Sequence, residues 1–235
     1  MDGAALLSDV AAFGPFFVVG TNPAESADPT WRPFADLYAD PAHLADRIAH
    51  VRRTLGSDDR VAASIAFQGL ATLLVSAPLA AVVAHRELPV LTPTTLHWRP
   101  AASGTWPLWC AEPVAEAAPD PAGALAGALV EPHLEPLVAA VRRQVPVSSR
   151  VLWGNVASSV AGARRMIAAA RPALAPRAAE VAAALLDTGV LRGTGELLPP
   201  GTPDRIWTFR RRSCCLFYRV PGGGLCGDCV LSARS

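Results

Sequence analysis

The sequence predicts an α+β protein that is predominantly helical, with a helical body, a few short strands and a small cysteine-rich segment at the C-terminus. Three observations support this class. Long stretches carry helix boundary signals around an apolar periodicity. Runs of β-branched and aromatic residues are few and short. Four of the five cysteines lie within residues 210–231.

Composition narrows the class of protein further. Apolar residues make up 51% of the chain, enough for a large buried core. The net charge of +1 gives no reason to expect nucleic acid as a partner. Asp2, Ser8 and Asp9 argue against a secretory signal at the N-terminus. We therefore expect a reducing cytoplasmic setting, in which clustered cysteines bind metal or carry out redox chemistry.

The first predicted helix covers residues 40–56, with Asp40 as its cap and Gly56 as its stop. A second, buried helix should follow. Residues 61–84 carry no charge over 24 positions, which is long enough to cross a bilayer. Polar residues and Pro78 interrupt this stretch. We therefore expect a buried helix that breaks at Pro78 and restarts, and no transmembrane span.

Three more helices are predicted in the second half of the body. Residues 121–145 should be helical in two pieces, because Pro132 and Pro136 interrupt them. Residues 148–172 begin with serine caps and end at a proline, and residues 176–189 close with a glycine.

Short strands are expected within residues 15–20, 88–98, 105–112 and 206–220, from their β-branched and aromatic content. Residues 192–205 are rich in glycine and proline and should form a connector. This connector divides the chain into a mostly helical body, residues 1–200, and a C-terminal segment, residues 201–235. The segment is too short to form a core of its own.

The C-terminal segment holds an adjacent pair, Cys214 and Cys215, and a C-x-x-C formed by Cys226 and Cys229. The C-x-x-C spacing lets two thiolates bind one metal ion. Adjacent residues of an extended strand point to opposite faces. The pair can therefore bind one centre only where the backbone kinks, or else it binds different atoms of a larger centre. The glycines of residues 220–224 would let the chain reverse between the two halves.

Spacing alone leaves three interpretations of these thiols. They could be a coincidental group of reduced or disulfide-bonded cysteines, a structural zinc knuckle, or the ligands of a binuclear iron–sulfur cluster. The concentration of four thiols in one short segment disfavours coincidence. Zinc and iron–sulfur remain about equally supported by the spacing.

The pattern C-C-x10-C-x2-C resembles the C-terminal signature of the FhuF-type ferric siderophore reductases, including the basic residues before the pair and the "CGDC" close. Upstream, "LWGNVASSVAGA" (residues 152–163) resembles the Trp-Gly-Asn segment of that family, and residues 60–91 are similar to its internal helical region. The resemblance covers most of the chain. It implies that four residues hold a 2Fe–2S cluster: Cys214, Cys215, Cys226 and Cys229.

The resemblance also implies an iron–sulfur oxidoreductase that reduces siderophore-bound Fe(III) to Fe(II) by one electron and releases the iron in the cytoplasm. The enzyme would be cytoplasmic, either free or peripheral to the inner face of the cell membrane. Its substrate would be a ferric siderophore of the hydroxamate type. The sequence lacks a dinucleotide-binding glycine pattern, so a separate ferredoxin or NAD(P)H-dependent reductase would supply the electrons. The alternative is a binding module stapled by zinc through the four cysteines, without redox turnover.

Trp153 and Asn155 match the family segment, and we expect Asn155 to make a buried polar contact. Cys110 has no cysteine near it in the sequence and is expected in the core. Arginines flank the four cysteines, where they would offset thiolate charge and attract an anionic chelate or an acidic donor. The candidates for docking the substrate or the donor are Arg210, Arg211, Arg212 and Arg219.

Overall fold

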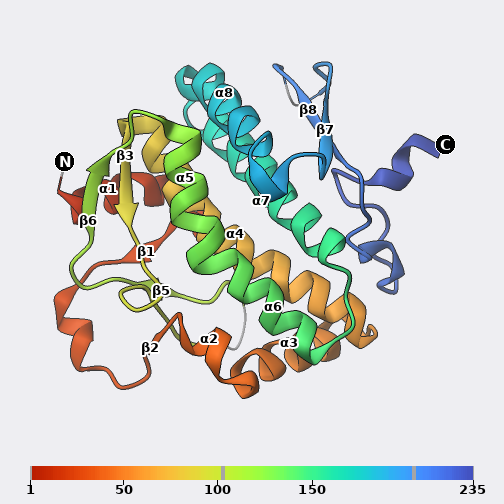
Figure 1. Ribbon diagram of the computed structural model, residues 1–235, viewed down its shortest axis with the longest axis horizontal. Helices are drawn as coiled ribbons and strands as arrows, with labels where there is room; N and C mark the ends of the chain where they lie inside the picture. The colour runs from red at the N-terminus through yellow and green to blue at the C-terminus, as the bar shows by residue number, and fades with distance from the viewer. Residues whose placement is uncertain (1, 102–103, 203–204, 235) are drawn as a thin grey trace.

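The computed structural model describes residues 2–101, 104–202 and 205–234. Two long helices, α4 (Asp59–His85) and α7 (Ser149–Ala170), pack against each other through the middle of the body (Figure 1). α3 (Pro41–Leu55) packs on α4, and α8 (Ala175–Leu186) packs on α7. The predominantly helical α+β class predicted from the sequence is confirmed.

Helix boundaries follow the capping signals of the sequence. The Asp40 carboxylate accepts a hydrogen bond from the backbone N–H of Ala42 at 2.8 Å, and Gly56 ends α3 in the left-handed conformation with φ 57°. At the start of α4, the Asp58 carboxylate accepts a hydrogen bond from the backbone N–H of Val61 at 2.9 Å. These contacts satisfy backbone groups that have no partner inside a helix.

The expectation that the second helix breaks at Pro78 was wrong. α4 runs through this proline without interruption over 27 residues. A proline inside a helix removes one backbone hydrogen bond and costs about 3 kcal/mol. Pro78 and the residues beside it are buried by neighbouring elements, and packing on several sides therefore keeps the helical geometry.

Two helical stretches, Asp59–His85 and Pro121–Gln144, have the length and apolar composition of membrane spans. In α4, 78% of the most apolar window is buried inside the protein, as in a core helix. The corresponding figure for the second stretch is 44%. That stretch consists of α5 (Pro121–Leu129), a π-helical turn η4 (Val130–Leu134) and α6 (Glu135–Gln144). The two pieces expected from its prolines are thus joined by a wider helical turn.

The remaining helical elements are short. α1 (Gly3–Val10) lies at the N-terminus and α2 (Asp36–Ala39) precedes α3. The 3-10 turns are η1 (Ala11–Phe13), η2 (Pro15–Phe17), η3 (Pro23–Ala27), η5 (Pro172–Leu174), η6 (Gly189–Leu191), η7 (Phe217–Arg219) and η8 (Val230–Arg234).

The strands of the described residues are short and form three small sheets. One sheet has the order β1-β5-β4-β2, and the other two are the antiparallel pairs β3–β6 and β7–β8. Sequence patterns missed β2, β6 and β7, which lack a β-branched or aromatic run. The domain boundary expected after residue 200 lies between the paired strands β7 and β8. The strands are β1 (Val19–Gly20), β2 (Arg32–Pro33), β3 (Glu87–Val90), β4 (His97–Trp98), β5 (Leu108–Trp109), β6 (Val114–Ala117), β7 (Gly195–Leu198) and β8 (Thr208–Arg211).

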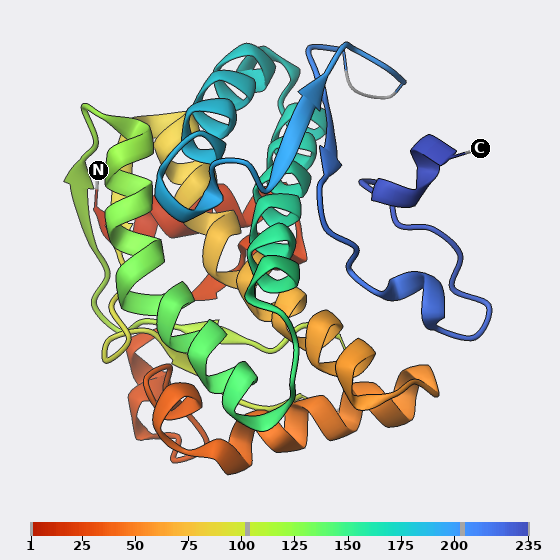
Figure 2. The ribbon, with the colours of Figure 1, turned by 45° about the vertical axis from the view of Figure 1, so that its right-hand side comes forward.

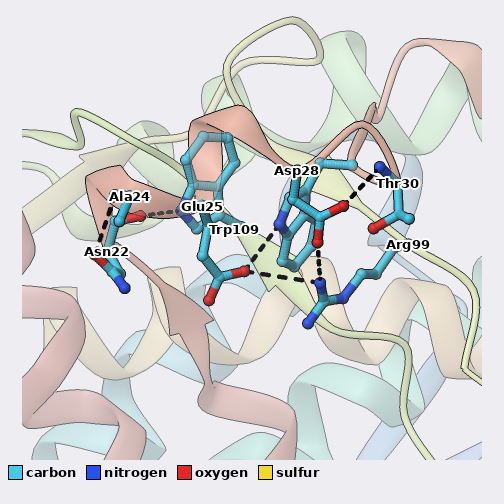
Figure 3. A network of polar contacts seen from close by, with 8 residues as sticks. Asn22, Ala24, Glu25, Asp28, Thr30, Arg99 and Trp109 are labelled. Atoms are coloured by element: carbon cyan, nitrogen blue, oxygen red, sulfur yellow. Dashed lines mark hydrogen bonds and ion pairs between the residues drawn. The ribbon is translucent and has the colours of Figure 1, made fainter.

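A network of polar and aromatic contacts fixes the loop before β2 onto the four-stranded sheet (Figure 3). Arg99 Nη1 donates a hydrogen bond to Asp28 Oδ2 at 2.9 Å, and its guanidinium lies 4.4 Å from the ring centroid of Trp31. The indole N–H of Trp31 donates to Glu25 Oε2 at 2.9 Å, and its ring stacks on Trp109. This network anchors the N-terminal part of the chain to the body.

Three helix ends meet at an ion pair. Arg171, which follows α7, donates from both terminal nitrogens to the Asp9 carboxylate of α1, at 2.8 and 2.7 Å. His85, the last residue of α4, lies 2.8 Å from Asp9 Oδ2 through its Nε2. The hydrogen bonds from Arg171 are the main reason that the pKa of Asp9 is lowered from 3.8 to about 2.

We predict that Asp9→Asn destabilises the protein at pH 7, because it removes the ion pair with Arg171. The loss should be only about 1 kcal/mol, since the Asp9 carboxylate is partly exposed and its charge is screened by solvent. A depressed folded-state pKa contributes stability above the unfolded value, near pH 4, and that stability is lost as the pH falls toward 2. Urea unfolding of wild type and variant between pH 7 and pH 2.5 should therefore show a difference that shrinks below pH 4.

Asp187→Asn is the matched control, because its pair with Arg192 is exposed on both sides and should contribute little. A constant Asp9→Asn effect down to pH 2.5 would contradict the ion-pair explanation.

Candidate metal centre

The cysteine-bearing tail, residues 205–234, lies along one side of the body beside α7, away from the N-terminus (Figure 2). Its first half docks on the starts of α4 and α7. Ser64 Oγ of α4 donates a hydrogen bond to the backbone oxygen of Cys215 at 2.8 Å. Ser213 Oγ donates to the backbone oxygen of Arg150 at 2.9 Å. Two tail residues that are close in sequence, Ser213 and Cys215, therefore attach the tail to α7 and α4, respectively.

Gly154 lies where the tail crosses α7. A Cβ atom at this position would overlap Ser213 Oγ and would lie 3.0 Å from Arg211 Nη2. A side chain here would displace the Ser213 hydroxyl from its place beside α7 and crowd the Arg211 guanidinium. The glycine of the Trp-Gly-Asn segment is thus explained by close approach of the Ser213 and Arg211 side chains to the helix backbone.

Asn155 joins the tail to α4 and is completely buried. Its Nδ2 donates to the backbone oxygen of Ser64 at 2.8 Å and to Ser64 Oγ at 3.0 Å. Its Oδ1 accepts a hydrogen bond from Arg211 Nη2 at 2.6 Å. The buried polar contact expected for Asn155 is present, and its partners are a serine and an arginine. Trp153 is partly buried against the core.

The adjacent cysteines are followed by a kink in the backbone, one of the two arrangements that the sequence left open. Leu216 adopts the left-handed conformation with φ 70°, which is uncommon for a residue with a side chain. Further along, Gly222 and Gly224 have φ of 72° and 70°, and the chain reverses there. These turns bring Cys226 back beside Cys215, with the two Sγ atoms 3.4 Å apart.

Backbone N–H groups point at the other two sulfurs. The N–H of Leu216 donates to Cys214 Sγ at 3.3 Å, and the N–H of Leu231 donates to Cys229 Sγ at 3.4 Å. Such hydrogen bonds stabilise thiolates and are one of the factors that tune iron–sulfur centres. Cys215 and Cys229 are buried, whereas Cys214 and Cys226 are partly exposed. The site therefore has an inner and an outer side.

The electrostatics of the tail favour a thiolate at Cys215. The hydrogen bond with Cys226 lowers the pKa of Cys215 to about 6 and raises the pKa of Cys226. Burial raises the pKa of Cys214. The charge of Arg211 opposes the rise in the pKa of Cys214 and Cys226 and adds to the fall in the pKa of Cys215. A positive charge thus acts on the thiol group from inside the protein.

The residues present fit a sulfur-ligated centre in their chemistry and in part of their geometry. A tetrahedral metal with sulfur bonds of about 2.3 Å separates two sulfurs by about 3.8 Å, close to the Cys215–Cys226 distance. Among the described residues, no three His, Cys, Asp or Glu side chains gather as a metal site. Complete ligation therefore requires movement of side chains beyond the contacting pair.

The four arginines expected to dock the substrate or the donor differ in accessibility. Arg210 donates to Glu196 at 2.7 Å, and Arg219 pairs with Asp58 at 2.8 Å. Both pairs are partly exposed, and Arg212 is exposed. Arg211 is only 1% exposed, so its side chain cannot meet a molecule in solution. The docking role expected for Arg211 is incompatible with this burial.

Cys110 lies outside the site, as expected. It is buried in the body, and its backbone N–H donates to the backbone oxygen of Gly20 at 2.9 Å. Sequence reasoning did not identify Ser64, Gly154 or Asp228 as parts of the site. The sequence offered one indication for Ser64, which is a polar residue within a long apolar helix. Asp228 is buried and accepts a hydrogen bond from Arg165 at 2.9 Å.

We predict that Gly154→Ala weakens the attachment of the tail by about 1–3 kcal/mol, because the new methyl group overlaps Ser213 and Arg211. The variant should lose its metal centre to a competing chelator several-fold faster than wild type, followed by the decay of its visible absorption.

Gly162→Ala is the matched control on the same helix, where the nearest atom to a new Cβ is Arg165 Nη2 at 4.0 Å. This variant should be as stable as wild type or slightly more stable, since alanine favours helix. Equal rates of loss in the two variants would contradict the close-approach explanation.

Comparison with known proteins identifies the cysteine segment as a cluster-binding domain. Residues 211–231 match the family model described as the FhuF 2Fe-2S C-terminal domain, so the cofactor is a 2Fe–2S cluster and the zinc alternative is not retained. Residues 79–199, just over half of the chain, match the model described as ferric iron reductase FhuF-like transporter. A search of curated proteins finds no match. The chain therefore belongs to the FhuF-like ferric iron reductase family.

Proposed function

We propose that this protein is a ferric siderophore reductase that passes one electron to chelated Fe(III) in the cytoplasm. The observation that carries the proposal is the thiol-bearing tail, which belongs to a 2Fe–2S domain and is attached to the outside of the body. When bound, a 2Fe–2S cluster exchanges one electron at a time. Its exchange with an external chelate requires a position near the surface, and the partly exposed Cys214 and Cys226 support such a position.

We further propose Cys214, Cys215, Cys226 and Cys229 as the ligands. The 3.4 Å contact between Cys215 and Cys226 supports their ligation of one iron, which leaves Cys214 and Cys229 for the other. In this division the two adjacent cysteines bind different irons, on either side of the backbone kink at Leu216. The body residues do not ligate; they hold the two cysteine segments in position.

The substrate chemistry follows from charge. Hard oxyanions such as hydroxamates bind Fe(III) far more tightly than Fe(II). Fe(III) in the chelate accepts one electron, becomes Fe(II) and is then bound weakly enough to dissociate. The reaction needs no acid–base residue at the site. Among the four arginines that flank the cysteines, Arg212 and the partly exposed Arg210 and Arg219 can attract an anionic chelate.

The electron donor is proposed to be a separate ferredoxin or NAD(P)H-dependent reductase, since the chain carries no dinucleotide-binding glycine pattern. Exposed Tyr218 and Leu225 on the tail give a donor or a chelate apolar surface to contact. The protein would work in the cytoplasm, either free or peripheral to the inner membrane face.

We predict that Cys226→Ser abolishes cluster binding. Anaerobically purified wild type should be red-brown and, after dithionite, show the rhombic resonance of a reduced 2Fe–2S centre, whereas the variant should lack both. Iron and acid-labile sulfide analysis gives the stoichiometry.

Cys110→Ser is the control, because Cys110 is buried in the body and should not ligate. A cluster that survives in Cys226→Ser and disappears in Cys110→Ser would overturn the ligand assignment.

The function is tested by mixing dithionite-reduced protein, freed of excess reductant, with a panel of ferric chelates in a stopped-flow instrument. At least one hydroxamate siderophore should restore the oxidised spectrum much faster than buffer does, with one Fe(II) formed per cluster oxidised. The gallium(III) complex of the same siderophore has the same charge and cannot be reduced in this way, so it should leave the protein reduced. If every ferric chelate acts no faster than buffer, the proposed function is wrong even though the cluster is real.

A further inference from the structure

Arg211 is a buried arginine without an acidic partner among the described residues. Its side chain is 1% exposed. Its Nε donates to the backbone oxygen of Ser213 at 2.8 Å, and its Nη2 donates to Asn155 Oδ1 at 2.6 Å and to the backbone oxygen of Val151 at 3.3 Å. Each of these acceptors is neutral. Nη1 is buried and has no hydrogen-bond partner in the part of the chain that the structure describes.

A guanidinium keeps its charge in proteins, and burying a charge without compensation is costly. Three other arginines in this region are paired with a carboxylate: Arg165 with Asp228, Arg210 with Glu196 and Arg219 with Asp58. Asp228 could have served Arg211, but its carboxylate pairs with Arg165 at 2.9 Å. The negative charge that balances Arg211 must therefore come from another source.

The position of Arg211 identifies that source. Its Nε is bonded to Ser213, the residue before Cys214, and its backbone N–H donates to the backbone oxygen of Asp228, between Cys226 and Cys229, at 3.1 Å. Through Asn155 it is linked to Ser64, which holds Cys215. Both cysteine segments are thus attached to the same arginine.

A 2Fe–2S cluster with four thiolates carries a net charge of about −2 when oxidised and about −3 when reduced. We propose that Arg211 is the buried counter-cation of the cluster, a positioning residue that holds the two cysteine segments together and raises the reduction potential. Its buried Nη1 is the donor left for the cluster. The proposal rests on the ligand set of the proposed function.

The test is an EPR-monitored redox titration of the cluster in wild type, Arg211→Met, Arg211→Lys and Arg212→Met. The reduced cluster carries one more negative charge than the oxidised cluster. Removal of a nearby cation therefore costs the reduced state more electrostatic stabilisation. Arg211→Met should therefore lower the equilibrium constant for reduction at least tenfold, a negative shift of about 59 mV or more for a one-electron couple. Arg211→Lys, which keeps the charge, should shift the potential by less than half as much.

Arg212→Met is the matched control, because it removes the same charge from the adjacent, exposed position. Its reduction potential should differ from that of wild type by only a small fraction of the Arg211→Met shift, since solvent screens the exposed charge. Equal potentials in the two methionine variants, or a positive shift in Arg211→Met, would overturn the proposal.

Loss of the cluster in Arg211→Met is also decisive. If Arg211→Lys then assembles a cluster, the charge is required for assembly and the proposal stands. If neither variant assembles one, the hydrogen-bonding shape of the arginine and not its charge is required; that result keeps the positioning role and overturns the counter-cation role. The potential is measured without any ferric chelate, so a failed siderophore assay would disprove the proposed reductase activity without affecting this result.

Discussion

The hydrogen bond between Arg211 and Asn155 is the contact on which the rest of the site depends. At 2.6 Å it connects the charged residue of the tail to the one buried amide of α7 that also binds α4 through Ser64. A hydrogen bond to a charged group contributes more than one between neutral groups, and an unsatisfied buried partner costs more still. The four-residue chain Arg211–Asn155–Ser64–Cys215 therefore makes the position of the tail an extension of the packing between the two central helices.

This arrangement explains how a short tail can hold a redox centre. Residues 205–234 are too few to form a stable core, so their shape has to be imposed by the body. α4 and α7 pack against each other and form the surface on which the tail lies. Gly154 has no side chain to block the close approach of the tail, and Ser64 and Asn155 supply hydrogen-bond partners in an apolar surrounding. The result keeps two cysteines buried and two partly exposed, which suits a centre that receives and delivers electrons at the surface.

The sequence was sufficient for the helical body, because caps such as Asp40 and Asp58 act locally and leave clear signals. It was misleading at Pro78, where tertiary packing outweighs a local preference for breaking the helix. The spacing also drew attention to the cysteine segment, and it left a kink beside the adjacent pair as one of two alternatives. The inward direction of Arg211 was not, because four neighbouring arginines look alike in sequence and only the fold buries one of them. The roles of Gly154 and Ser64 depend on contacts between residues that are far apart in the chain.

The central claim is that Arg211 and Asn155 act as one unit in attaching the tail to the body. A double-mutant cycle measures this directly, with urea unfolding of wild type, Asn155→Ala, Arg211→Met and the double variant. We expect a coupling free energy of about 2 kcal/mol, with the double variant little less stable than the worse single variant. Effects of the two substitutions that add to within about 0.5 kcal/mol would contradict the account.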